Sequence, residues 1–268
     1  MNRHRSPASQ ARTVLRARKF ADSDRSPTRS PPPDGLRSLA VKTQSIRFRG
    51  GVARVAAWHG RPEIASVALL CRGAPSIDAI ENLVEQLRAS GYTEVITNAL
   101  APGSSLPLVD CGFEIRGRLH LLSHDFESLP GPTRRTRRSG HGDRNTVLAV
   151  DAAAFEDFWQ LDAVGLEQAA RATPRSHLRV TRGEIMGYGL FGRAERTGYV
   201  QRLAIHPDAQ GKGFGLALLT DGLHWMRVRG ARSAFVNTQV ENARALSLYE
   251  RAGFRRLPVG LCVLGRTL

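Results

Sequence analysis

The stretch GYVQRLAIHPDAQGKGFGLALL, residues 198–219, decides the fold of the second half of this chain. A β-rich run at 198–205 is followed by glycines at 211, 213 and 215, and then by an apolar run that predicts a helix over 214–229. Glycines let backbone N–H groups converge, and the N-terminus of a helix favours an anion such as a pyrophosphate. An ordinary glycine-rich turn is the alternative interpretation of the loop taken alone.

Neither of the two common nucleotide loops matches this spacing. The Walker pattern G-x-x-x-x-G-K-[ST] requires a glycine where His206 stands and a hydroxyl residue where Gly213 stands. The dinucleotide pattern G-x-G-x-x-G requires a glycine at 216 or at 218, and both positions are leucine. We therefore expect the loop to hold a phosphate-bearing ligand of another kind.

Around the loop, residues 143–268 predict alternating helices and strands. Helices are expected over 147–155 and 161–172, and between Asn242, a natural N-cap, and Gly253, a C-terminal stop. Besides the run at 198–205, strands are expected at 177–183, 184–193, 232–239 and 261–268. This alternation predicts an α/β (α+β) domain with a mixed sheet.

The first part of the chain repeats the end of this pattern. A helix, a glycine, a strand, an asparagine, a Gly-Phe pair and a further strand follow one another in the same order in both halves. Agreement of the whole series predicts a duplicated unit. The paired landmarks are Gly91 and Gly230, Asn98 and Asn237, and the Gly-Phe pairs Gly112-Phe113 and Gly253-Phe254.

Charge is distributed unevenly along the 268 residues. Two thirds of the formal net charge of +15 falls in residues 1–40 and 131–140. We predict a disordered basic tail over 1–40, an Arg-rich linker over 129–142, and folded units over 41–128 and 143–268. Because most of the excess charge lies outside the folded units, the composition disfavours nucleic-acid binding by them.

The cysteines and the apolar runs narrow the class of protein further. Cys71, Cys111 and Cys262 have the spacing of neither a disulfide framework nor a zinc site, so we expect no metal. No apolar run reaches the roughly 18 residues of a membrane span, and we expect a cytoplasmic protein that does not enter a membrane. The Arg/Ser-rich start resembles a transit peptide in composition. An untargeted tail, or a start site placed too far upstream, is the alternative.

Two motifs in residues 143–268 resemble those of the GNAT superfamily of N-acetyltransferases. The loop from Gln210 to Gly215 resembles the signature [QR]-x-x-G-x-[GA] between a strand and a helix. The next predicted helix matches N-x-x-A-x-x-x-Y-x-x-x-G-F at Asn242, Ala245, Tyr249, Gly253 and Phe254. The resemblance implies two GNAT-like domains, each a twisted mixed β-sheet flanked by helices, with activity confined to 143–268.

The resemblance also implies roles for individual residues. The pantetheine arm of acetyl-CoA would lie along the strand, and its pyrophosphate would bind the loop. Tyr249 would act as general acid toward the departing thiolate, and a buried core aromatic is its alternative role. Asn242 would contact the cofactor, which is compatible with N-capping. The implied cofactor residues are Leu203, Ala204, Ile205, Gln210, Gly211, Lys212, Gly213, Phe214, Gly215, Leu216 and Asn242.

The sequence departs from the family where a general base is expected. Some members place a glutamate five residues before the motif asparagine, where this chain has Asn237, and others place it on the strand before the loop, where residues 199–203 hold no carboxylate. An amine nucleophile must lose a proton, so the base is unassigned. Glu241 and His206 are candidates, and each has a simpler role, in helix electrostatics and in the shape of the turn.

Residues 153–166, AAFEDFWQLDAVGL, are expected to form the wall of the acceptor site. Their aromatic side chains would line an apolar pocket, and their carboxylates would attract an ammonium group. An amphipathic helix end with solvated acids is the alternative. The candidates are Phe155, Phe158, Trp159 and Asp162, with Glu156 and Asp157 as further acids.

In the first unit, residues 71–76 stand where the glycine-rich loop would be. Two of its three glycines are lost, and Pro75 removes a backbone N–H donor. We predict a degenerate domain that binds no cofactor and helps to shape the acceptor site.

The sequence thus predicts an acetyl-CoA-dependent N-acetyltransferase that acts on a primary amine of a small molecule or a protein. The missing base favours an alternative, an acyl-CoA-binding regulatory protein without turnover. A nucleic-acid-associated protein that works through its basic tails is a third hypothesis.

Overall fold

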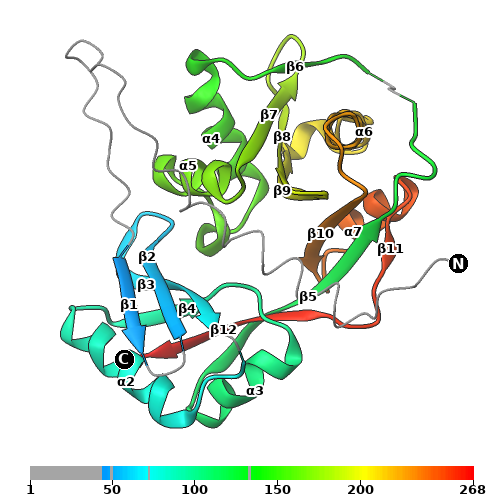
Figure 1. Cartoon of the computed structure of the whole chain (residues 1–268). Helices are drawn as coiled ribbons and strands as arrows, with labels where there is room; N and C mark the ends of the chain where they lie inside the picture. Colours follow the sequence, from blue (N-terminus) through cyan, green and yellow to red (C-terminus); the bar gives the residue numbers. More distant parts are fainter. Residues whose placement is uncertain (1–43, 49–50, 72, 132–133) are drawn as a thin grey trace, which may run out of the picture.

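The computed structural model describes residues 44–48, 51–71, 73–131 and 134–268, and the expected basic tail over 1–40 lies outside them. Within this part of the chain, twelve strands join in one mixed sheet on which helices pack, which confirms the predicted α/β class with a helix-flanked mixed sheet. The two separate sheets expected for two domains are here joined into one. None of the helices described is long and apolar enough to cross a membrane. The chain forms two lobes, drawn blue to cyan and green to orange in Figure 1.

The second lobe follows the predicted alternation of helices and strands, with ends that differ from the prediction by a few residues. Its helices are α4 (Arg144–Ala154), α5 (Ala163–Arg171), α6 (Phe214–Val228) and α7 (Ala243–Arg251), with short 3-10 turns η2 (His141–Asp143), η3 (Asp157–Trp159) and η4 (Pro207–Ala209). Its strands are β7 (Arg175–Thr181), β8 (Gly187–Ala194), β9 (Thr197–Ile205), β10 (Ser233–Gln239) and the two-residue β11 (Arg255–Arg256).

The first lobe contains strands β1 (Gln44–Phe48), β2 (Gly51–Trp58), β3 (Arg61–Cys71) and β4 (Glu94–Thr97), with helices α2 (Ile77–Ala89) and α3 (Pro102–Asp110). β2 and β3 are antiparallel, and β3 and β4 are parallel with α2 between them. The same succession joins β8, β9 and β10 through α6. This order of pairing agrees with the predicted duplication, and the assignment of the first lobe as a degenerate acetyltransferase domain stays a prediction.

The two lobes exchange strands. β5 (Glu114–His124) leaves the first lobe and pairs with β10, and β12 (Leu261–Thr267) leaves the second lobe and pairs with β4. The strand order is β1-β2-β3-β4-β12-β5-β10-β9-β8-β7-β6, with β11 on β5. Figure 1 shows β12, in red, entering the blue and cyan lobe. The predicted units 41–128 and 143–268 divide the chain, while the hydrogen-bonded sheet runs across that division.

Buried apolar residues hold α6 against the sheet and so fix the loop that precedes it. Leu219, Leu223 and Met226 recur at helical spacing and are fully buried. Gly222 lets the helix close on Phe191 of β8, because a Cβ at this position would overlap the aromatic ring. Burying one such leucine contributes about 1.5–3 kcal/mol.

The Arg-rich linker is partly structured, which corrects the expectation of an unfolded segment. Within this linker, Thr136–Arg138 form strand β6, which pairs with β7 at the edge of the sheet. Arg137 Nη1 lies 2.6 Å from Asp143 Oδ2, and Thr136 donates a hydrogen bond to Asp221 of α6. These partners lie outside the local sequence pattern, so composition alone did not reveal them.

Candidate active site

A gap opens between β9 and β10 because the two strands pair only at their beginnings. The parallel register joins residues 233–235 to residues 197–199, and the strands then diverge. On its other edge β9 stays paired with β8 as far as Ile205. Within the described sheet, the later half of β9 therefore has one edge of backbone groups without a partner strand. Such an edge can bind an extended ligand chain as an extra strand would.

Strand β9 contains a β-bulge at the point where it separates from β10. Leu190 pairs with Arg202 and Phe191 pairs with Val200, so Gln201 is the extra residue of β9. Gln201 Nε2 donates a hydrogen bond to the carbonyl oxygen of Ala169 in α5 at 2.7 Å. A bulge bends its strand and increases the local twist, and this one lies directly after the last residues of β9 that pair with β10.

Gly211 and Gly213 turn the chain from β9 into α6. Their φ angles of 76° and 83° lie in the left-handed region that favours glycine. Gly213 is the N-cap residue of α6 and has no side chain to bond the first N–H groups of the helix. Gly215 allows close approach to α7, because a Cβ there would lie 3.1 Å from Leu248 Cδ2. The loop thus offers backbone donors and the positive end of a helix to an anion.

Two arginines bring further positive charge to this loop. Arg244 Nη1 donates a hydrogen bond to Gln210 Oε1 at 2.6 Å. Arg134, from the segment between the lobes, stacks on Phe214 with its guanidinium carbon 4.8 Å from the ring centre. Its Nε lies 3.7 Å from the place where Gly213 would carry a Cβ. The sequence analysis placed Arg134 in a linker, and the anchoring of that segment on α6 brings it to the loop.

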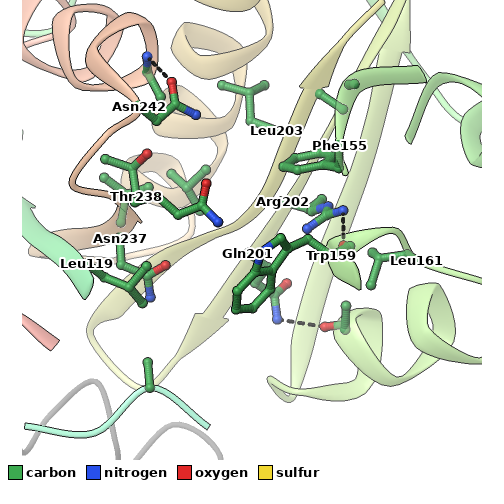
Figure 2. A pocket seen from close by; sticks show the side chains of 18 of the residues that line it. Leu119, Phe155, Trp159, Leu161, Gln201, Arg202, Leu203, Asn237, Thr238 and Asn242 are labelled. Atoms are coloured by element: carbon green, nitrogen blue, oxygen red, sulfur yellow. Dashed lines mark hydrogen bonds between the residues drawn. The ribbon is translucent and has the colours of Figure 1, made fainter. Parts of the chain in front are cut away.

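The gap between β9 and β10 belongs to a cleft of about 2240 Å³ that also reaches the first lobe. Figure 2 shows Asn237 and Asn242 on one side and Phe155 and Trp159 on the other. Every cofactor residue predicted from the sequence lines this cleft except Lys212. Those that do are Leu203, Ala204, Ile205, Gln210, Gly211, Gly213, Phe214, Gly215, Leu216 and Asn242.

α7 brings the second motif to the same cleft. Asn242 Oδ1 accepts a hydrogen bond from the N–H of Ala245 at 2.9 Å and caps the helix, as its position predicts. Tyr249 lines the cleft with only 6% of its surface exposed. Burial raises the pKa of Tyr249, and the nearby guanidinium of Arg202 opposes this in part. The phenol therefore keeps its proton at neutral pH.

Comparison with known proteins identifies this part of the chain. Residues 145–254 match the family model described as "Acetyltransferase (GNAT) family". These residues form a GNAT-family acetyltransferase domain. A mycothiol acetyltransferase of Amycolatopsis mediterranei is 31% identical over 170 residues, which cover 54% of this chain and 56% of that protein. One of Rhodococcus opacus is 46% identical over 59 residues, which cover 22% of this chain and 19% of that protein. In the longer match, the chain spans about half the length of its relative.

Solved structures share the fold. A GCN5-related N-acetyltransferase from Sphaerobacter thermophilus has a TM-score of 0.58 and 17% identity, and the match covers 99% of this chain and 94% of that one. A tandem GNAT protein from the clavulanic acid biosynthesis pathway has a TM-score of 0.58 and 14% identity, covering 81% of this chain and 78% of that one. At such identities the likeness concerns the fold alone, and the first match extends over both lobes.

A buried ion pair that the sequence analysis missed joins α4 to β9 of the acetyltransferase domain. Asp151 is 0% exposed, and its carboxylate oxygens accept hydrogen bonds from Nε and Nη2 of Arg202, each at 2.8 Å. The carboxylate also accepts from the Tyr188 hydroxyl and from the N–H of Leu161. The sequence contained one indication of this pair, because Asp151 is the single carboxylate in the apolar run 147–155. A charge buried with that run requires partners.

Arg202 also fixes the segment that is expected to form the acceptor wall. Its Nη2 donates a hydrogen bond to the carbonyl oxygen of Trp159 at 2.8 Å, and its guanidinium carbon lies 3.4 Å from the centre of the Phe155 ring (Figure 2). Phe155 and Trp159 both line the cleft. One side chain of β9 thus orients two of the aromatic residues singled out in the sequence.

The other two acceptor candidates do not line the cleft. Phe158 packs on Trp58 of the first lobe, with ring centroids 5.3 Å apart. Asp162 Oδ1 accepts a hydrogen bond from the N–H of Gly165 at 2.7 Å and caps α5. These two residues therefore help to fix the position of the segment 153–166 without lining the cleft.

The first lobe completes the cleft of the acetyltransferase domain. Trp58 Nε1 donates a hydrogen bond to the carbonyl oxygen of Phe158 at 3.0 Å, which docks the end of β2 against η3. Among the described residues, no Asp or Glu lines the cleft, and neither base candidate, Glu241 or His206, does so. The side chains that line it from the first lobe include Arg54, Trp58, His59, Ser66, Thr97 and Asn98.

Proposed function

We propose that the protein is an acetyl-CoA-dependent N-acetyltransferase that acts on a primary amine of a small molecule. One observation carries the proposal: the open edge of β9 leads directly into a glycine loop at the N-terminus of α6, with the buried phenol of Tyr249 in the same cleft. The family match over 145–254 supports acetyl-CoA as the donor.

Cofactor binding would use the backbone more than side chains. Residues 203–205 of β9 would bond the amides of the pantetheine arm along the open edge, and the N–H groups of 211–215 would bind the pyrophosphate. Arg134 and Arg244 would add charge at the phosphates. Lys212 would have a secondary role, because the N–H groups of the loop and of the helix start are the main donors for a pyrophosphate.

Acetyl transfer would use the same two elements. The amine attacks the thioester carbon, and the oxyanion that forms requires hydrogen-bond donors, which free N–H groups of β9 would supply. The thiolate leaves with a proton from Tyr249, whose phenol is protonated at neutral pH because burial raises its pKa.

The first lobe would hold no second acetyl-CoA, so we propose 143–268 as the catalytic domain and 41–128 as a degenerate one. Helix α2 stands where α6 stands in the second lobe. One of its first N–H groups already has a partner, since Ser76 Oγ accepts a hydrogen bond from the N–H of Ala79 at 3.3 Å. Pro75, just before this cap, offers no N–H.

The acceptor is proposed to be a small molecule because its site would lie in a cleft lined by both lobes. The relatives named mycothiol acetyltransferases support this class. Because this chain spans about half the length of the longer-matching relative, mycothiol-related amines are candidates to test, alongside amino acids, amino sugars and polyamines.

Calorimetry and an amine panel test the proposal. The full chain is used, because β5 and β12 complete the lobes reciprocally. We expect one acetyl-CoA to bind per chain at sub-millimolar concentration, and at least one amine to give CoA release with an acetylated product seen by mass spectrometry. Absence of binding would contradict the proposal. Binding without CoA release for any amine would favour a regulatory acyl-CoA-binding protein.

A further inference from the structure

We propose that His59, supplied by the first lobe, accepts the proton that the acceptor amine loses. The inference rests on the proposed acetyltransferase function and supplies the base that the second lobe lacks. It assigns to the first lobe a part in the chemistry in addition to its part in the shape of the cleft.

Few of the side chains that line the cleft could accept a proton. The described residues that line it include no Asp, Glu, Lys or Cys. Its arginines stay protonated at all relevant pH values, and Tyr249 is the proposed acid. His59 is the sole histidine in this set. Its imidazole is therefore the one side chain among them, apart from the phenol assigned as the acid, that can take part in proton transfer as a neutral base.

The turn that carries the imidazole is held by contacts with its neighbours. His59 lies in the tight turn between β2 and β3 and has a φ of 40°, which is uncommon for a residue with a side chain. The Trp58 ring lies beside it, with centroids 4.2 Å apart, and Trp58 is itself bonded to the carbonyl oxygen of Phe158. The turn is thus docked on the acceptor wall, and the wall fixes the imidazole.

A carboxylate lies beside the imidazole. His59 Nδ1 and Asp162 Oδ1 each lie 3.0 Å from the same point, the place where Gly165 would carry a Cβ. The two groups therefore pack together against Gly165, which allows this approach because it has no side chain. Nδ1 is buried and makes no hydrogen bond within the described residues. An Nδ1–H turned toward Asp162 would leave Nε2 as the nitrogen that accepts the proton.

Four charged groups act on His59 from the elements around it. Arg202 on β9 and Arg61 on β3 disfavour the imidazolium, and Asp162 before α5 and Asp151 on α4 favour it. Burial is the largest effect, and with Arg202 it lowers the pKa of His59 to about 4. The imidazole is therefore neutral, with a lone pair available, wherever an amine would be acetylated. Asp162 would stabilise the imidazolium that forms.

Arg202 links the proposed base to the proposed acid, because its charge acts on His59 and on Tyr249 alike. In the step, the amine nitrogen bonds to the thioester carbon and the C–S bond breaks. The proton of the nitrogen passes to His59 Nε2, directly or through one water, and Tyr249 gives its proton to the thiolate. Water then returns a proton to Tyr249 and removes one from His59, so the net products are the amide and CoA.

The test compares His59→Gln with His141→Gln, a histidine on η2 that is exposed and does not line the cleft. We expect H59Q to lower kcat/KM for the amine by about 100-fold or more, while the Kd for acetyl-CoA changes less than twofold. The H141Q variant should match the wild type in both. An active wild type with an H59Q variant within threefold of it would overturn the inference.

A second variant separates proton transfer from packing. We expect added imidazole to restore part of the activity of His59→Ala, and its remaining rate to rise with pH as free amine replaces ammonium. Loss of activity with neither imidazole rescue nor this pH dependence would contradict a chemical role. Acetyl-CoA binding reports whether each variant is folded. A wild type that binds acetyl-CoA but acetylates no amine would remove the proposed function and the inference with it.

Discussion

Arg202 and Asp151 form a bidentate ion pair across the acetyltransferase domain, with both N–O distances at 2.8 Å. The two side chains are 15% and 0% exposed, so the pair lies largely out of water. The pair joins β9, the strand proposed to bind the pantetheine arm, to α4, the helix that precedes the proposed acceptor wall. The geometry of the proposed donor and acceptor sites therefore depends in part on this buried pair.

Replacement of Asp151 tests this dependence. Asp151→Asn leaves the guanidinium of Arg202 buried without its counter-charge, a change that costs about 3–5 kcal/mol in such pairs. We expect urea denaturation to show a decrease of this size in the free energy of unfolding. Asp157→Asn, an exposed acid in the same wall, is the matched control and should change stability by no more than about 0.5 kcal/mol. Equal effects of the two changes would contradict the interpretation.

Tyr249→Phe removes the proposed general acid and keeps the ring. We expect kcat to fall by about 100-fold, with the Kd for acetyl-CoA unchanged within twofold. Because burial raises the pKa of Tyr249, ionisation of this phenol should cause no loss of wild-type activity up to pH 10. Tyr92→Phe in the first lobe, which lies outside the cleft lining, is the control. A Y249F variant with wild-type kcat would show that the ring serves packing alone.

Arg134→Gln tests the contribution of the segment between the lobes to phosphate binding. Hydrogen bonds to charged groups contribute about 1.5–3 kcal/mol, so we expect the Kd for acetyl-CoA to rise about tenfold or more at low salt. The KM for S-acetyl-pantetheine, which has no phosphates, should not change. The neighbouring Arg135→Gln is a matched control, since both arginines are exposed and only that of position 134 stacks on Phe214 of the loop. Equal Kd values for the two variants would remove Arg134 from the phosphate site.

The lowered pKa values of three histidines predict how the free energy of unfolding depends on pH. The pKa of His59 falls from 6.5 to about 4 on folding, so between these values the unfolded chain binds more protons than the folded one. The free energy of unfolding should therefore decrease as the pH falls from 6.5 toward 4, by at most about 2 kcal/mol at pH 5 for this group. Burial also lowers the pKa values of His124 and His177, which adds to the decrease.

His59→Asn isolates the share of this effect that comes from His59. Its denaturation midpoint should depend less on pH between 7 and 4.5 than that of the wild type, with His141→Asn as the exposed control. Identical pH dependence in wild type and H59N would show that His59 titrates normally in the folded protein.

Local sequence patterns were sufficient to predict most helices and strands of the second lobe. The glycine loop, the helix that follows it and the cap at Asn242 depend on residues within one or two turns of each other, so their positions follow from short spacings. The predicted helices and strands from 147 onward are present for the same reason. The degenerate nature of the first unit was inferred from a lost loop, and its order of strand pairing agrees with a duplication.

Contacts between distant segments were outside the reach of these patterns. The pairing of β12 with β4, the edge strand β6 and the pair between Asp151 and Arg202 each join segments whose local sequence does not specify the partner. Phe158 and Asp162 have the composition of an acceptor wall, yet they face Trp58 and the start of α5 instead of the cleft.

The sequence by itself determined the family of the second lobe, because a strand, a glycine loop and two helix starts can be recognised at fixed short spacings. The tertiary structure decided which side chains meet at the acceptor end of the cleft. That choice depends on how the lobes dock, through contacts such as the one between Trp58 and Phe158, which are 100 residues apart. Burial against the second lobe then makes His59 a neutral imidazole, because the pKa of a side chain follows from its surroundings in space.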